Sequence, residues 1–307
     1  MNRLRAAALG ALCVVTAAAG AWALAHPQNS LADTLIRAVA DCSVVATLGL
    51  VVVPMFDEPR HRDRLADRAA GPLILASAGW SVAELVRLFL GAAEAAGSSA
   101  GLVGWRTTVE FALDTAAGRS NLLCLAAALV VCLVASVAPK TPAATVVAAG
   151  AAAMGVAGRS LVGHLSESPL GGLSIAVHTL AAALWCGALA ALVLTVSHRG
   201  QWARVLPRFS QFSLVCVVVL LVCGTAGAFV TLDAPTDLYA TGYGRVLTAK
   251  IAVTAVLVTL AWRNRAGWLP AARSHRATAS VSRVRSQIEL AIMAVALTLA
   301  AALAVTG

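Results

Sequence analysis

Long runs of apolar residues dominate this sequence, and short polar connections separate them. A helix needs about 17 or more mostly apolar residues to cross the roughly 30 Å hydrocarbon layer of a bilayer. Backbone polar groups in lipid must be satisfied within each segment, so such runs predict helices. The expected fold is all-α, a polytopic membrane helical bundle of about nine transmembrane helices. The nine runs lie near residues 6–25, 31–56, 71–93, 120–138, 142–158, 172–196, 207–232, 242–262 and 286–306.

The first run has two interpretations. Arg3 and Arg5 precede it and Ala23-Leu24-Ala25 ends it, a pattern that also describes a cleavable signal peptide. Residues 1–25 are therefore either the first transmembrane helix or a signal peptide, whose removal would leave eight helices. No repeat of fixed period and no Gly/Ser linker divides the chain, so we expect residues 1–307 to form a single membrane-embedded domain.

Composition supports a membrane protein. The chain is 60% hydrophobic and 12% charged, whereas soluble domains are about 25% charged. Its net charge of +9 comes mainly from arginines in alternate connections, so it indicates membrane orientation and not a nucleic-acid partner. The positive-inside rule predicts a multi-pass protein of the cytoplasmic (inner) membrane, with a cytoplasmic N-terminus and an external C-terminus.

The largest external connection spans residues 94–119. Glu110 and Asp114 are four residues apart and would share one face of a helix. Two interpretations stay open here, a short interfacial or re-entrant helix over the bundle and a solvated loop helix.

Several charged residues fall inside the apolar runs, where each costs on the order of 2.5–3.5 kcal/mol on insertion scales. They could be intrahelical pairs, Arg37 with Asp41 and Glu84 with Arg87. Alternatively, they line an external vestibule in which an acid of the second or third helix pairs with Lys250. The vestibule residues on this interpretation are Asp41, Glu84, Trp185 and Lys250.

Two histidines are the strongest candidates for a binding site. His164 lies in a short polar loop, and His178 lies fourteen residues later inside an apolar run. Imidazole is a good ligand for copper and zinc. The plain alternatives are a solvated loop for His164, an interhelical hydrogen bond for His178 and bundle packing for Trp185. Weaker candidate ligands are His26, Met154 and Cys186.

The C-terminal half resembles the copper-resistance protein D (CopD) family, over about residues 155–306. Cys186 and Ala188 depart from this pattern, since the family commonly has Val and Gly there. The resemblance rests on four motifs in chain order: Gly163-His164; His178 with Trp185-x-Gly187; Arg208-Phe209-Ser210 opening a helix that continues to Gly224; and Thr241-x-Tyr243-Gly244-x-x-Leu247-x-x-Lys250.

The resemblance implies copper uptake into the cytoplasm, with copper bound at His164 and His178. It also implies a partner, a separate extracytoplasmic copper-binding protein of the CopC type, besides the copper ion and membrane lipid. Passage inward would have to use thiols, because Glu289 is the one ionisable residue expected in the inner half. The candidate thiols are Cys132, Cys186 and Cys216.

Two rival functions remain at this point. The chain could bind copper as a sensor or assembly scaffold without moving it. It could also carry electrons through a bis-imidazole haem, which needs two histidines at matching depth on facing helices. An enzyme is not expected, because the sequence has no nucleophile–base pair, phosphate loop or HExxH motif.

Overall fold

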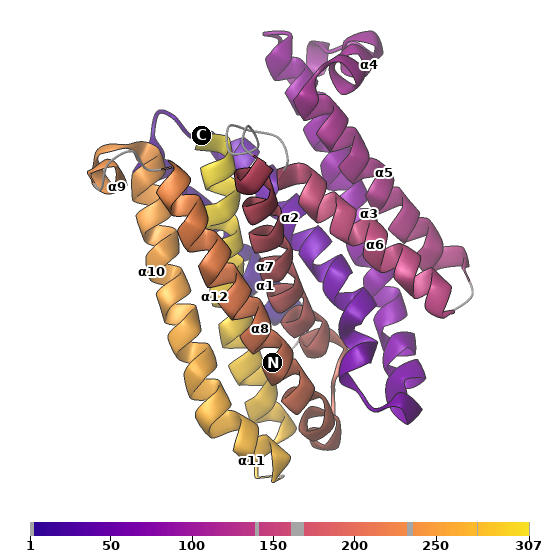
Figure 1. Ribbon diagram of the computed structural model, residues 1–307. Coiled ribbons are helices and arrows are strands. Elements are labelled where there is room, and N and C mark those ends of the chain that lie inside the picture. Colours follow the sequence, from indigo (N-terminus) through magenta and orange to yellow (C-terminus); the bar gives the residue numbers. More distant parts are fainter. Residues whose placement is uncertain (1–2, 139–140, 161–168, 232–235, 275, 307) are drawn as a thin grey trace.

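The chain is helical in the computed structural model, which describes residues 3–138, 141–160, 169–231, 236–274 and 276–306 (Figure 1). No strand occurs within these ranges. The long helices are α1 (Arg3–Ala25), α2 (Leu31–Val52), α3 (Arg62–Ala95), α5 (Ala116–Val137), α6 (Pro142–Ser160), α7 (Pro169–Thr195), α8 (Arg199–Thr231), α10 (Gly242–Arg263) and α12 (Ala279–Thr306). The short ones are η1 (Val53–Phe56), η2 (Pro59–His61), η3 (Ala100–Leu102), α4 (Trp105–Asp114), α9 (Asp237–Ala240), η5 (Asn264–Trp268) and α11 (Leu269–Arg273).

The long helices confirm the predicted membrane bundle. Each of the nine apolar runs corresponds to one of them, and eight helices in the described part of the chain are long and apolar enough to cross a membrane. The exception is α6, which has 19 residues and ends on Arg159 and Ser160. Alanine and glycine make it only moderately apolar.

Two helices begin earlier than the apolar pattern predicts. The apolar runs start at residues 71 and 207, but α3 starts at Arg62 and α8 starts at Arg199. Arginine is a good helix former, so these helices continue beyond the apolar layer as polar turns.

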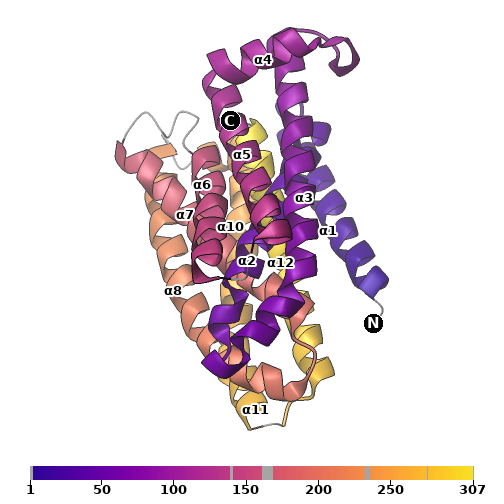
Figure 2. The same cartoon turned by 90° about the vertical axis from the view of Figure 1, so that its right-hand side faces the viewer.

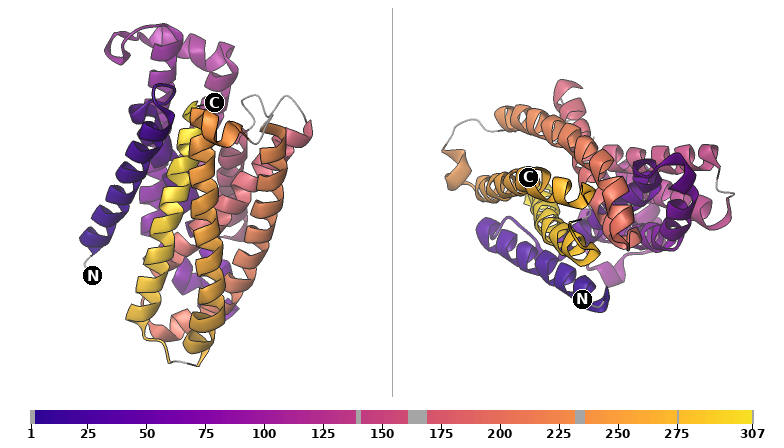
Figure 3. Two further views of the ribbon diagram at one scale, coloured as in Figure 1. Left: turned by 90° about the vertical axis from the view of Figure 1, so that its left-hand side faces the viewer. Right: turned by 90° about the horizontal axis from the view of Figure 1, so that it is seen from below.

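The centre of the bundle is formed by α2 and α7 (Figures 1 and 2). α2 packs against α3, α7, α12 and α6, and α7 packs against α8, α2 and α6. On one side lie α3, α5 and α6, and on the other lie α1, α8, α10 and α12 (Figure 3). Residues that are distant in sequence therefore meet along the two central helices.

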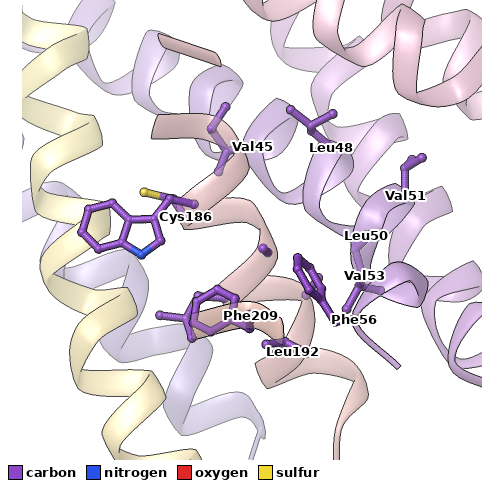
Figure 4. Packing of buried hydrophobic residues seen from close by; sticks show 14 of the residues in the cluster. Val45, Leu48, Leu50, Val51, Val53, Phe56, Cys186, Leu192 and Phe209 are labelled. Atoms are coloured by element: carbon purple, nitrogen blue, oxygen red, sulfur yellow. The ribbon is translucent and has the colours of Figure 1, made fainter. Parts of the chain in front are cut away.

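The contact between α2 and α7 is made by backbone against backbone. A Cβ atom added to Gly49 would lie 1.9 Å from the carbonyl oxygen of Gly187, and one added to Gly187 would lie 2.2 Å from that of Val45. Small residues allow such close approach between membrane helices. Below this crossing the core is filled by larger side chains, and the ring centroids of Phe56 and Phe209 are 6.0 Å apart (Figure 4).

The arginine-rich connections gather at one end of the molecule. This end contains the starts of α3 and α8 together with α11, whereas the C-terminus, α4 and α9 lie at the opposite end (Figures 1 and 3). The arrangement agrees with the orientation expected from the positive-inside rule.

The external connection contains the expected short helix, α4, in which Arg106 Nε donates to Glu110 Oε1 at 2.9 Å. The exposed side chains of Leu102 and Trp105, 82% and 78% accessible, favour the interfacial interpretation.

Candidate functional site

His178 is partly buried on α7 and faces α8. Its Nδ1 lies 2.9 Å from the carbonyl oxygen of Leu220. A carbonyl only accepts hydrogen bonds, so we assign the hydrogen to Nδ1. This tautomer leaves the lone pair of Nε2 free. In metal-binding histidines, the ring nitrogen that does not bind the metal usually donates such a hydrogen bond, which orients the ring.

Gly224 of α8 makes room for the imidazole. A Cβ atom at this position would lie 2.9 Å from His178 Cε1 and 3.1 Å from Nδ1. Ser174 Oγ, one turn earlier on α7, donates to the carbonyl of Cys223 at 3.2 Å. The position of the ring is therefore set by the absence of a side chain on the neighbouring helix.

Lys250 of α10 is close enough to His178 for the lysine charge to act on the imidazole. None of the described carboxylates forms an ion pair with this lysine. Trp185 lies deeper on α7 and is 2% exposed, and its indole Nε1 has no hydrogen-bond partner in the described part of the chain. The expected floor of the site is thus a buried tryptophan with an unused donor.

The acids expected in the vestibule belong to a different cluster. Arg159 of α6 forms ion pairs with both Asp41 of α2 and Glu84 of α3. Glu84 also accepts from Arg87 Nη1 at 3.0 Å and from Asn121 Nδ2 at 2.6 Å. The expected Glu84–Arg87 pair is confirmed, but the proposed pairing of an acid with Lys250 is wrong, because arginines already hold both carboxylates.

We call Arg37, Asp41, Glu84, Arg87, Asn121 and Arg159 the four-helix polar cluster, since it joins α2, α3, α5 and α6. Arg37 interacts electrostatically with Asp41, although Arg37 Nε has no hydrogen-bond partner among the described residues. Three arginines face two carboxylates, so the cluster is net positive and unsuited to hold a cation.

Sequence reasoning missed Arg159 and Asn121. The predicted apolar run ends near residue 158, just before Arg159, whereas the Arg159 side chain is 8% exposed and points into the bundle. The available signal was that Arg159 directly follows an apolar run, while two acids, Asp41 and Glu84, lie inside other apolar runs and need a positive partner.

The remaining candidate ligands do not gather around His178. His164 lies outside the described residues. His26 is exposed beyond the end of α1, with its ring 5.1 Å from that of Trp22, and Met154 is 57% exposed on α6. Cys186 is 5% exposed and belongs to the apolar core (Figure 4). Within the described ranges, no three His, Cys, Asp or Glu side chains are arranged to hold a metal ion.

Deeper in the bundle, Cys42, Cys216 and Glu289 lie near Cys186, and Cys132 is not among these neighbours. Glu289 of α12 is 3% exposed and accepts from Asn264 Nδ2 at 2.8 Å. It lines a pocket of about 100 Å³ between α8, α10 and α12. Three thiols and one carboxylate therefore lie together around Cys186, about two turns further along α7 than His178.

Comparison with known families gives two matches. A family described as copper resistance protein D matches residues 203–303, and one described as copper resistance protein D-like, N-terminal domain, matches residues 28–171. The two matches cover most of the chain. Residues 172–202, with His178 and Trp185, lie between the matched segments. No curated protein matches the chain, and no solved structure does.

Proposed function

Since the chain belongs to the copper-resistance protein D family, we propose that this multi-pass membrane protein takes up copper across the cytoplasmic membrane. Copper is the transported ion, and the chain carries it without catalysing a reaction. Capture takes place toward the end opposite the arginine-rich connections, where α7 begins and His178 lies.

The observation that carries the proposal is the geometry of His178. An imidazole in an apolar helix needs a specific reason, because polar groups in a membrane are costly. The bond from Nδ1 to the Leu220 carbonyl satisfies one nitrogen and leaves Nε2 as a free ligand. Imidazole nitrogen suits copper. His164, fourteen residues earlier in the sequence, is the proposed second ligand.

Soft ligands support a path inward from this site. Thiolate and thioether sulfur select Cu(I), and Cys42, Cys186 and Cys216 lie near one another on the inner side of His178. Glu289 follows at the end of this group. A separate extracytoplasmic protein of the CopC type is the proposed donor of copper.

Copper uptake by cells that express matched protein levels tests the proposal. His178→Ala and His164→Ala should each reduce uptake of radioactive copper at least about tenfold, because loss of a residue that merely orients a metal ligand already costs about this much. Leu173→Ala is the control, because Leu173 is 62% exposed on the same helix. Unchanged uptake in the double histidine variant would refute the capture site.

Proteoliposomes distinguish the rival functions. Copper that binds to the purified protein without entering the vesicles would favour a sensor or assembly scaffold. A Soret absorbance band in the purified protein would favour the haem electron carrier.

A further inference from the structure

A polar pocket of about 310 Å³ opens at the arginine-rich end, far from His178 along α7. It lies between η2 with the start of α3 and the start of α8. We call it the basic pocket. The residues that line it are Asp57, His61, Arg64, Arg68, His198, Gly200, Gln201 and Arg204.

Positive charge exceeds negative charge in the basic pocket. Its one carboxylate, Asp57, is 1% exposed and receives two hydrogen bonds from Arg204, at 2.9 and 3.1 Å. Asp57 and Arg204 therefore neutralise each other. The guanidinium groups of Arg64 and Arg68 remain as uncompensated charge.

The pocket wall is held in place by its own hydrogen bonds. Arg68 Nη1 donates to Ser197 Oγ at 3.1 Å and to Gln201 Oε1 at 3.0 Å. The same Gln201 oxygen accepts from the backbone N–H groups of Ser197 and His198, at 3.1 and 3.3 Å. The connection before α8 is thus fixed in front of α3, and the positive N-terminal end of α8 borders the pocket.

Arg64 is free to bind a ligand. It is exposed, and its side chain has no hydrogen bond or ion pair with any described residue. Gly200 leaves the opposite wall open, because an added Cβ would have no atom within 4 Å.

We propose that the basic pocket binds a phosphate group, either the headgroup of an anionic phospholipid or free phosphate. A guanidinium group can donate two parallel hydrogen bonds to two oxygens of one phosphate group. Basic pockets between membrane helices bind anionic headgroups. The pocket also lies at the membrane edge, since the nearby side chains of Met55 and Leu194 are 64% and 52% exposed. The assignment is independent of copper.

Native mass spectrometry of the full-length protein, taken from nanodiscs of phosphatidylglycerol and phosphatidylcholine, tests the lipid source. Arg64→Gln should reduce retained phosphatidylglycerol about fivefold, as expected for one basic residue beside an anionic lipid. Arg199→Gln is the matched control, because Arg199 is exposed at the same end but does not line the pocket.

The free-phosphate source is tested by thermal unfolding of delipidated protein in detergent with inorganic phosphate or with chloride of equal ionic strength. Stabilisation by phosphate that Arg64→Gln abolishes, without selective lipid retention, assigns the pocket to free phosphate. If the protein shows no lipid retention and no phosphate stabilisation that depends on Arg64, the proposal is overturned. A loss in Arg199→Gln equal to that in Arg64→Gln also overturns it, because general surface charge would then explain binding.

Discussion

His178 is positioned by two features of α8, a carbonyl group and a missing side chain. The Leu220 carbonyl fixes which ring nitrogen carries hydrogen, and Gly224 fixes how close the ring approaches. Neither residue can ligate copper with its side chain. Both still decide the direction in which the lone pair of Nε2 points in the proposed copper site.

Gly224→Ala should weaken copper binding about 10–100-fold, the usual range for a residue that orients a ligand. The added methyl group would displace the imidazole, which it would approach to 2.9 Å. Isothermal titration of purified protein measures the affinity. Gly227→Ala is the control. Gly227 lies on the same helix as Gly224, and a Cβ atom added there would have no atom within 4 Å. Equal affinities for both variants would contradict the positioning role.

A second prediction at this scale concerns Asp57, which lies between two membrane-spanning segments. Burial alone raises the pKa of Asp57, but hydrogen bonds from Arg204 and from the Glu58 backbone, with the nearby positive charges, outweigh it. The pKa is therefore held below its usual value. An acid with a lowered pKa stabilises the fold above the unfolded pKa, roughly 3.9, and this stabilisation is lost as the pH falls through the folded value.

Asp57→Asn should therefore destabilise the protein by about 2 kcal/mol at pH 7, as for loss of hydrogen bonds to a charged group. The difference in the free energy of unfolding between Asp57→Asn and the original protein should stay constant down to about pH 5 and become smaller below about pH 4. Thermal unfolding in detergent over this range measures it. Asp63→Asn, an exposed acid in the first turn of α3, should show no such pH dependence.

Single residues were predictable from sequence only in part. The burial of His178 followed from its apolar neighbours, and the Glu84–Arg87 pair followed from helical spacing. Arg159 did not, because an arginine at a helix end reads the same whether it points to water or folds back toward buried acids. Only the neighbouring helices, here α2 and α3, decide between the two.

Among the long helices, α2 and α7 pack with their backbones in direct contact. Their backbones touch at Gly49 and Gly187, so neither position has room for a methyl group. Gly187→Ala should destabilise the protein by at least about 2 kcal/mol, as overpacking does, and reduce the yield of monodisperse protein. Size-exclusion profiles and thermal unfolding measure this. Gly150→Ala on α6 is the control, because its Cβ would lie in open space.

The four-helix polar cluster joins helices through charge. Arg159→Met should destabilise the protein by about 3–5 kcal/mol, because it removes the buried ion pairs of Arg159 with Asp41 and Glu84. Adding Glu84→Gln should restore part of the stability, since the buried charge is then removed as well. Thermal unfolding of the two single variants and the double variant gives the coupling. Additive losses would show that Arg159 and Glu84 do not act together.

Helix positions were predicted well and helix starts less well. Apolar runs locate the segment in lipid, but α3 and α8 extend beyond it as arginine-containing turns. Hydropathy registers where lipid ends, whereas a helix ends where its backbone hydrogen bonds end.

The whole molecule has one arginine-rich end and one end that contains the C-terminus (Figure 1). We predict that the arginine-rich end is cytoplasmic. Alkaline phosphatase fused after the C-terminus should be active, and green fluorescent protein fused there should be dark. Fusions after residue 266, at the opposite end, should give the reverse. The same result at both positions would contradict this topology.

The order of helix packing is what the sequence did not reveal. Hydropathy shows that helices exist, but it does not show that α10 packs on α12 and α1 while α3 packs on α2 and α5. The expected partnership of Lys250 with Asp41 or Glu84 failed for this reason. The copper family, in contrast, was recognised from short motifs alone.

The central helix α7 is tied on both sides. Its Gly187 presses on α2, within the segment matched by the N-terminal family, and its His178 bonds to α8, within the segment matched by the C-terminal family. Sliding either half past the other would have to break the glycine crossing or pull the imidazole from its carbonyl. We expect an ion held by that imidazole to lie at the contact between the two halves, so that its binding and release would be coupled to any movement between them.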